Sequence, residues 1–188
     1  MAAPDRQRWG NPNSYKPGWA RRAELAATLV RDGARVLEVG VGTGAFRDLV
    51  RDRTEYMGVD LEPLDDATLA LDLDRDPLPA LTFDCAVLLG VFGYLHQPES
   101  SARKLCDAAN CVIVSYCCRR TDVEQDVALK ARIGRGWANH YDRAQLVELF
   151  CRQGHRLVMT TPLNTTDDFE QCIMTFQRQE RQDGSAPA

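Results

Sequence analysis

The run VLEVGVGTGAF at residues 36–46 decides how the rest of this chain is interpreted. It joins an apolar strand pattern at residues 35–39 to three closely spaced glycines, and a short helical stretch follows. The glycines are Gly40, Gly42 and Gly44. They let the backbone turn sharply and approach a ligand closely, because no side chain stands in the way. The run therefore predicts a strand, a ligand-binding turn and a helix.

Strand and helix patterns alternate along the rest of the chain. We expect strands at residues 35–39, 55–59, 68–71, 83–89, 111–116, 155–160 and 171–177. Helices are predicted at residues 19–31, 45–51, 98–108, 122–132 and 142–153. Such alternation implies a mainly parallel sheet with helices on both faces, a fold that binds ligands at the carboxyl ends of its strands. The expected organisation is an irregular N-terminal arm at 1–18, one domain at 19–177 and a polar tail at 178–188.

Composition and charge narrow the class of partner. The chain has 188 residues, 44% of them hydrophobic, which is enough for one buried core. Its net charge of -4 argues against a broad basic surface for nucleic acid, so a small-molecule partner is favoured. No apolar stretch has the length of a membrane span or a signal peptide, which predicts a cytoplasmic protein without a membrane partner. Seven cysteines without metal-binding spacing, and no cluster of Asp, Glu and His, predict no metal site.

Two ligand classes fit the glycine run. Gly40, Gly42 and Ala45 satisfy the relaxed dinucleotide pattern, and Asp60 could hold a ribose hydroxyl of either ligand. Glu38 separates the two classes. Its carboxylate suits the ammonium and sulfonium groups of S-adenosylmethionine but would repel a pyrophosphate.

A second acidic position supports the same ligand. Asp72 follows the third predicted strand and offers an acceptor for an adenine amino group, with Leu73 beside it to pack on the ring. The chain also ends in a helix and two strands, without the second nucleotide-binding half that a dehydrogenase of this type carries. The residues therefore favour S-adenosylmethionine over a dinucleotide.

On these motifs the chain resembles the class I S-adenosylmethionine-dependent methyltransferases over residues 19–177. EVGVGTG at 38–44 matches the glycine motif of the family, Asp60 its acidic residue after the second strand, and Asp72 its adenine-side acidic residue. The resemblance implies an α/β, Rossmann-like, doubly wound sheet of seven strands in the order 3-2-1-4-5-7-6, with strand 7 antiparallel. It also implies S-adenosylmethionine as cofactor and a methyl acceptor that is an oxygen or nitrogen of a small molecule or saccharide. The cofactor-binding residues that it implies are Glu38, Gly40, Val41, Gly42, Gly44, Asp60, Leu61, Asp72, Leu73 and Gly90.

A narrower similarity is to small methyltransferases found with surface-polysaccharide genes. It is carried by Gly90-Val91 with Tyr94, by Ser115-Tyr116 and by GWANH at 136–140. Two alternatives to a methyltransferase stay open. One is an NAD(P)-dependent Rossmann oxidoreductase, and the other is a non-catalytic protein that binds S-adenosylmethionine as a partner or regulator.

A general base would assist transfer to a hydroxyl or a protonated amine, and histidine is its usual source. His140 is the predicted catalytic residue, because it lies between a Gly-rich segment and a helix N-cap, where a loop is expected over the cofactor. The alternative is that its ring only packs against that turn. His96, after the fourth strand, is the second candidate, and His155 is interpreted as structural.

The acceptor pocket and the arm carry further open interpretations. Aromatic residues that could line the pocket are Tyr94, Tyr116, Trp137 and Tyr141. The basic residues Arg119, Arg120, Lys130, Arg132 and Arg135 could attract a phosphorylated acceptor, but interspersed acidic residues favour a solvated helix face. Tyr15, Lys16 and Trp19 could fold over the cofactor as a lid, or belong to a terminus without fixed structure.

Overall fold

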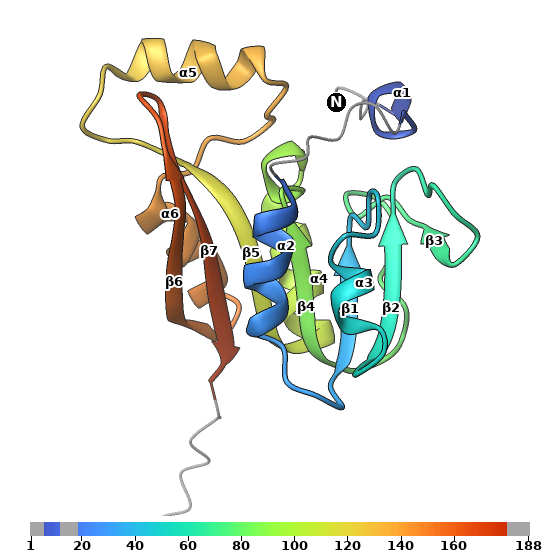
Figure 1. The fold of residues 1–188 in the computed structure, drawn as a ribbon. Coiled ribbons are helices and arrows are strands. Elements are labelled where there is room, and N and C mark those ends of the chain that lie inside the picture. Colours follow the sequence, from blue (N-terminus) through green and yellow to red (C-terminus); the bar gives the residue numbers. More distant parts are fainter. Residues whose placement is uncertain (1–5, 12–18, 180–188) are drawn as a thin grey trace, which may run out of the picture.

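A computed structural model describes residues 6–11 and 19–179 of the chain, and its centre is a seven-stranded sheet (Figure 1). The strands are β1 (Arg35–Val39), β2 (Glu55–Asp60), β3 (Thr68–Ala70), β4 (Phe83–Leu89), β5 (Ala109–Arg119), β6 (His155–Thr165) and β7 (Phe169–Arg178). Their order in the sheet is β3-β2-β1-β4-β5-β7-β6. Neighbouring strands from β3 to β5 pair in parallel, and β7 is antiparallel to both β5 and β6. The predicted order and the antiparallel seventh strand are confirmed.

Helices cover both faces of this sheet and its upper edge. The helices are α1 (Arg6–Trp9), α2 (Ala20–Thr28), α3 (Arg47–Val50), α4 (Pro98–Ala108), α5 (Gln125–Gly134) and α6 (Arg143–Cys151), with a 3-10 turn η3 at Phe92–Tyr94. In Figure 1, α2 and α3 lie in front of the sheet and α4 and α6 behind it. The short helix α1 and the helix α5 stand above the carboxyl ends of the parallel strands. No helix in the described part of the chain is long and apolar enough to cross a membrane.

The central strands form because both of their faces are buried. In β1 every residue after Arg35 is buried, and Leu37 and Val36 are fully covered by opposite helix layers. Each such side chain contributes about 1.5–3 kcal/mol by leaving water. The register pairs Glu38 with Gly58 of β2 and with Val87 of β4. This places a carboxylate in the middle of the sheet, at its ligand-binding edge.

The later strands are longer than the sequence pattern predicts. β5, β6 and β7 all extend beyond the expected ranges, and β6 includes Pro162. This strand is the sheet edge, where a missing N–H is tolerated, and its register shifts between Pro162 and Asn164. At the start of α6, Asp142 accepts a hydrogen bond from the Gln145 amide at 2.9 Å, as expected of an N-cap.

The N-terminal arm differs from the expectation of an irregular segment. Residues 6–9 form the single helical turn α1, which is tied to distant parts of the domain. Arg6 donates to the Leu61 carbonyl at 3.1 Å, and Arg8 donates to the Arg135 carbonyl at 3.1 Å. Tyr15 and Lys16, predicted as parts of a lid, lie outside the described residues, as do residues 180–188 of the tail.

Candidate functional site

A cavity of about 790 Å³ opens at the carboxyl ends of β1, β2, β4 and β5. Residues from α1, α2 and α5 line it together with the strand ends, so it lies below the two helices at the top of Figure 1. Nine of the ten predicted cofactor-binding residues line this cavity, namely Glu38, Gly40, Val41, Gly42, Asp60, Leu61, Asp72, Leu73 and Gly90. Gly44 is not among the lining residues; its backbone φ of 81° shapes the same turn.

The glycine turn at residues 40–44 is shaped so that side chains do not fit. Gly40 has a φ of 84°, and a Cβ built there would overlap the Val91 side chain. Gly90, also with positive φ, approaches Arg22 so closely that a Cβ would lie 2.5 Å from its guanidinium. The two loops therefore leave bare backbone at the cavity wall, which a ligand can approach closely.

Glu38 brings a carboxylate to this wall although it is only 2% exposed. The Tyr56 hydroxyl donates a hydrogen bond to its Oε2 at 2.5 Å. Burial raises the pKa of Glu38 to about 8, although the Tyr56 hydrogen bond acts in the opposite direction and Asp60 adds to the increase. A cation in the cavity would stabilise the ionised form, so the residue suits a positively charged ligand group.

Asp60 ends β2 next to the glycine turn. Its Oδ2 accepts from the Gly42 amide at 2.8 Å and its Oδ1 from the Glu62 amide at 3.2 Å. Burial raises the pKa of Asp60, while these backbone hydrogen bonds oppose the rise. The carboxylate thus fixes the turn and lines the cavity at the same time.

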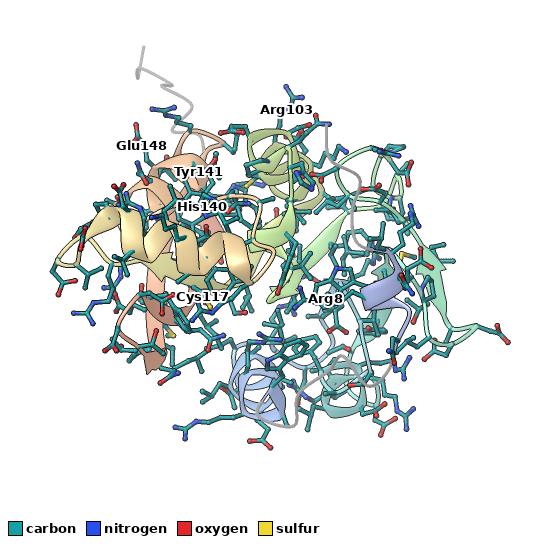
Figure 2. All side chains as sticks on the ribbon, turned by 90° about the horizontal axis from the view of Figure 1, so that it is seen from above. Arg8, Arg103, Cys117, His140, Tyr141 and Glu148 are labelled. Carbon is teal, nitrogen blue, oxygen red and sulfur yellow. The ribbon has the colours of Figure 1, made fainter. Side chains whose placement is uncertain are left out.

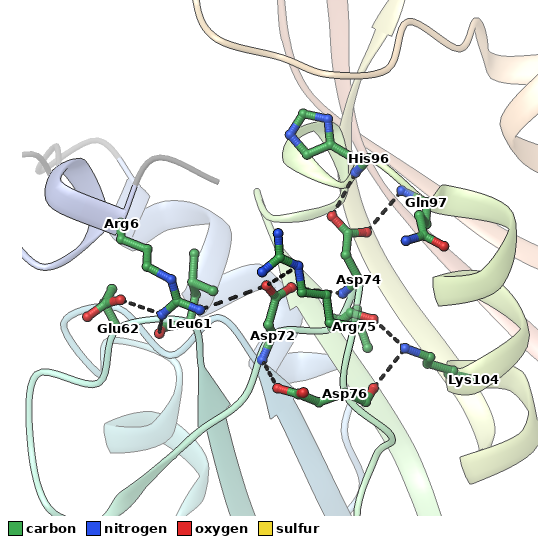
Figure 3. Close-up of polar contacts among 11 residues, drawn as sticks. Arg6, Leu61, Glu62, Asp72, Asp74, Arg75, Asp76, His96, Gln97 and Lys104 are labelled. Atoms are coloured by element: carbon green, nitrogen blue, oxygen red, sulfur yellow. Dashed lines mark hydrogen bonds and ion pairs between the residues drawn. The ribbon is translucent and has the colours of Figure 1, made fainter. Parts of the chain in front are cut away.

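Asp72 lies beyond the end of β3 and keeps one oxygen without a hydrogen bond (Figure 3). Its Oδ1 accepts from the Asp74 amide at 3.1 Å, while the buried Oδ2 has only longer ion pairs, 3.7 Å to Arg75 and 3.8 Å to Arg6. A buried acceptor without a hydrogen bond is costly unless a ligand satisfies it. Together with the bare glycine turn and the Glu38 carboxylate, Asp72 fits an adenosyl ligand that carries a cation.

The α5 side of the cavity contains aromatic side chains. Trp137, Tyr94 and Tyr116 line it as predicted, whereas Tyr141 does not. Sequence reasoning missed Trp9, whose ring lies edge-to-face on Tyr94 with centroids 4.8 Å apart. No local pattern could have shown this contact, because it joins residues far apart in the sequence.

Arginines also line the cavity against expectation, among them Arg132 and Arg22. The sequence favours a solvated face for Arg132, but the structure buries it completely, so that interpretation is wrong for this residue. Its Nη1 donates to the Cys117 carbonyl at 2.5 Å, and its Nη2 donates to the Tyr116 hydroxyl at 3.2 Å. Arg22 of α2, which sequence reasoning did not single out, lines the cavity beside Gly90.

The three histidines occupy different environments. His96 lines the cavity, whereas His140 is not among the lining residues of the described chain. His140 Nδ1 accepts from Arg132 Nε at 3.3 Å, and Figure 2 shows the histidine close to α5. Burial lowers the pKa of His140, and the charges of Arg132 and Arg119 lower it further, so the ring is neutral near pH 7. His155 is buried, and its Nε2 lies 3.2 Å from the Ala109 carbonyl.

Solved structures share the fold at low sequence identity. The magnesium protoporphyrin IX methyltransferase of Synechocystis PCC 6803, with bound S-adenosylhomocysteine, is 13% identical with TM-score 0.67, covering 92% of this chain and 94% of that chain. A TehB-like S-adenosylmethionine-dependent methyltransferase of Corynebacterium glutamicum ATCC 13032 is 22% identical with TM-score 0.62, covering 92% and 95%. The [4+2]-cyclase SpnF is 15% identical with TM-score 0.68, covering 85% and 80%. No curated protein matches the chain.

The family assignment comes from a sequence match. The family model described as a methyltransferase domain matches residues 14–160, which is more than half of the chain and includes the glycine turn, Asp60, Asp72 and the strand ends that line the cavity. The strand order and the predicted cofactor motif agree with it. The chain therefore belongs to the class I S-adenosylmethionine-dependent methyltransferases and is an enzyme of that family.

Proposed function

We propose that this enzyme transfers a methyl group from S-adenosylmethionine to an oxygen or nitrogen of a small molecule or saccharide. The observation that carries the proposal is the buried Glu38 carboxylate at the tip of β1, next to a turn that only glycine can form. A dinucleotide would bring a pyrophosphate to the same place and be repelled. The cavity thus favours a ligand with a cation near this strand tip.

The lining residues suggest how each part of the cofactor would be held. Glu38 would bind the ammonium group and Asp60 the ribose hydroxyls. Oδ2 of Asp72, which has no hydrogen bond, would bind the adenine amino group. Leu61 and Leu73 would pack against the adenosine. When bound, S-adenosylmethionine supplies a methyl group activated by its sulfonium, and the aromatic α5 side is left for the acceptor.

A catalytic role for His140 stays a prediction. With Arg132 donating to Nδ1, the neutral ring carries its proton on Nε2, so Nδ1 would have to leave Arg132 before it could accept a substrate proton. Positioning and exclusion of water can supply much of the rate of methyl transfer without a base. The proposed function therefore does not depend on His140.

Titration calorimetry on the purified chain tests the proposal. We expect binding of S-adenosylmethionine and S-adenosylhomocysteine and no comparable binding of NADH. Tight binding of NADH with no response to S-adenosylhomocysteine would establish the oxidoreductase alternative instead. Turnover is then measured with methyl-labelled S-adenosylmethionine against hydroxyl, amine and saccharide acceptors. Binding without label transfer to any of them would favour the non-catalytic alternative.

A further inference from the structure

The charged side chains that line the cavity are divided by sign. The carboxylates lie at or after the carboxyl ends of β1, β2 and β3, where the cofactor is proposed to bind, and they are Glu38, Asp60, Asp72 and Asp74. The guanidinium groups come from the helices α1, α2 and α5 and from the residue that follows α5, and they are Arg8, Arg22, Arg132 and Arg135. Of these, Arg135 is ion-paired with Asp168 at 2.6 Å. Figure 2 shows Arg8 reaching in from the side opposite α5. A chain with a net charge of -4 thus concentrates positive charge on one side of its cavity.

Arg132 carries a buried charge without a carboxylate partner among the described residues. Its hydrogen bonds go to neutral acceptors only: His140 Nδ1, the Cys117 and Asn139 carbonyls and the Tyr116 hydroxyl. Other arginines of the same region are paired, as in Arg135–Asp168 at 2.6 Å and Arg119–Asp142 at 3.4 Å. Burying a cation without a counter-charge costs several kcal/mol, so this one raises the positive potential of the cavity beside it.

Arg22 of α2 is a second cavity arginine whose charge is not balanced by a carboxylate among the described residues. Its guanidinium lies 5.2 Å from the Trp19 ring centroid, and its buried Nε has no hydrogen-bond partner. Within the described ranges, no carboxylate lies at ion-pair distance from it. Its charge is therefore also available to an anion in the cavity.

Aromatic rings stand between these cations. The Trp137 ring centroid lies 4.6 Å from the Arg132 guanidinium carbon and 5.5 Å from that of Arg135. On the α1 side, the Arg8 guanidinium carbon lies 5.3 Å from the Tyr94 ring centroid. Such surfaces accept the face of a planar or sugar ring, and the arginines select for an attached oxyanion.

We propose that the methyl acceptor is an anion, a ring compound that carries a carboxylate or phosphate and is held on the arginine side of the cavity. The inference rests on the proposed function, since it assigns the acceptor half of that site. S-adenosylmethionine contributes one carboxylate of its own, which Arg22 beside Gly90 can neutralise. The charge of Arg132 on the α5 side then remains for the acceptor, whose oxyanion offsets the cost of burying it.

The test measures how tightly small probe molecules bind to the complex of the protein with S-adenosylhomocysteine. Tryptophan fluorescence and calorimetry detect this binding. Benzoate is compared with benzamide and glucuronate with glucuronamide, so that each anion has a neutral counterpart of nearly the same shape. We expect at least one anion to bind about tenfold tighter than its amide, a difference of about 1.4 kcal/mol. The benzoate and glucuronate arms distinguish an aromatic acceptor from a saccharide one.

Variants then locate the anion. Arg8→Gln and Arg132→Gln should each reduce the preference for the anion over its amide. Arg152→Gln, an exposed arginine at the end of α6 that pairs with Glu148, should leave it unchanged. Because Arg132→Gln could fail to fold, Arg8→Gln provides the independent variant.

Two results would overturn the inference: equal binding of both anions and their amides, or an anion preference that both cavity variants retain. Either result, obtained while S-adenosylhomocysteine still binds, leaves the proposed methyl transfer standing. Failure of S-adenosylhomocysteine to bind at all would instead remove the proposed function.

Discussion

Tyr56 and Glu38 share a hydrogen bond of 2.5 Å beneath the glycine turn, with the phenol as donor and Oε2 as acceptor. The residues belong to neighbouring strands, and both pKa values are raised because burial disfavours their ionised forms. In the ligand-free protein at neutral pH the pair is therefore mainly uncharged. A cation arriving in the cavity changes that balance by favouring the Glu38 carboxylate.

Cofactor binding should release a proton from Glu38 at pH 7. The ammonium of S-adenosylhomocysteine favours the carboxylate, whereas the free protein, with a Glu38 pKa of about 8, holds the proton. Calorimetry in buffers of different ionisation enthalpy should detect up to one proton released, and affinity should rise with pH until about pH 8. Glu38→Gln should abolish the release and weaken binding about tenfold or more. Binding of unchanged strength and proton count in this variant would show that Glu38 does not contact the ligand.

The same residue should make the ligand-free protein less stable as the pH rises. The pKa of Glu38 is raised in the folded state, so its contribution to stability is present below about pH 4.5 and is lost as the pH approaches about 8. Glu38→Gln has no such loss. Between these pH limits, the free energy of unfolding of the variant, measured with denaturant, should rise by a few kcal/mol relative to that of the native chain. The reason is that a tenfold change in proton affinity corresponds to about 1.4 kcal/mol. A difference between the two chains that is constant with pH would contradict the raised pKa.

Gly40→Ala should be more harmful than an alanine at another glycine with positive φ. Gly33 has a φ of 71° and open space where a Cβ would stand, so Gly33→Ala measures backbone strain alone, about 1–2 kcal/mol. Gly40→Ala adds the overlap with Val91, which should cost at least about 1 kcal/mol more. In urea unfolding, Val91→Ala should recover part of this loss in the Gly40→Ala background. Strictly additive effects would mean that the two side chains do not compete for space.

His140→Gln should lower kcat by about 100-fold if its imidazole takes the acceptor proton, the lower end of what a general base contributes. Since the pKa of His140 is lowered, activity of the native enzyme should persist below the pH at which an ordinary histidine becomes protonated, and the variant should lose this pH dependence. His96→Gln is the matched control, because His96 lines the cavity without being the predicted base. A kcat change confined to His96→Gln, with binding of S-adenosylhomocysteine intact in both variants, would transfer the role to His96.

The sequence predicts the strands that are buried on both faces most accurately. The observed bounds of β1 and β4 agree with their predicted ranges, because continuous apolar residues bounded by turns leave little freedom of interpretation. The length of the edge strand is harder to predict from the sequence. β6 carries Pro162 and mixes polar with apolar residues without a regular alternation, so its length is set by pairing with β7 rather than by its own pattern.

The proposed acceptor side of the cavity depends on contacts that no local sequence pattern contains. Arg8 reaches the Arg135 carbonyl at 3.1 Å although the two residues are far apart in the sequence. Arg132 belongs to a stretch rich in charge, yet its side chain is buried by Tyr116 and Trp137 from other segments. The residues predicted to bind the cofactor line the cavity because they lie at or just after strand ends, which the sequence pattern reveals. The arginine side emerges only from the packing of helices.

The Val91 side chain occupies the space that a side chain at position 40 would need. The glycine turn and the loop after β4 therefore depend on each other, although a redesign would otherwise treat them separately. The loop after β4 also brings Tyr94 and His96 to the cavity, so an engineer seeking a new acceptor would naturally exchange it for another enzyme's loop. Any incoming residue bulkier than valine at position 91 would push on the glycine turn. Grafts should therefore be screened for retained S-adenosylhomocysteine affinity before catalysis is assayed, and both loops should be transplanted as one cassette.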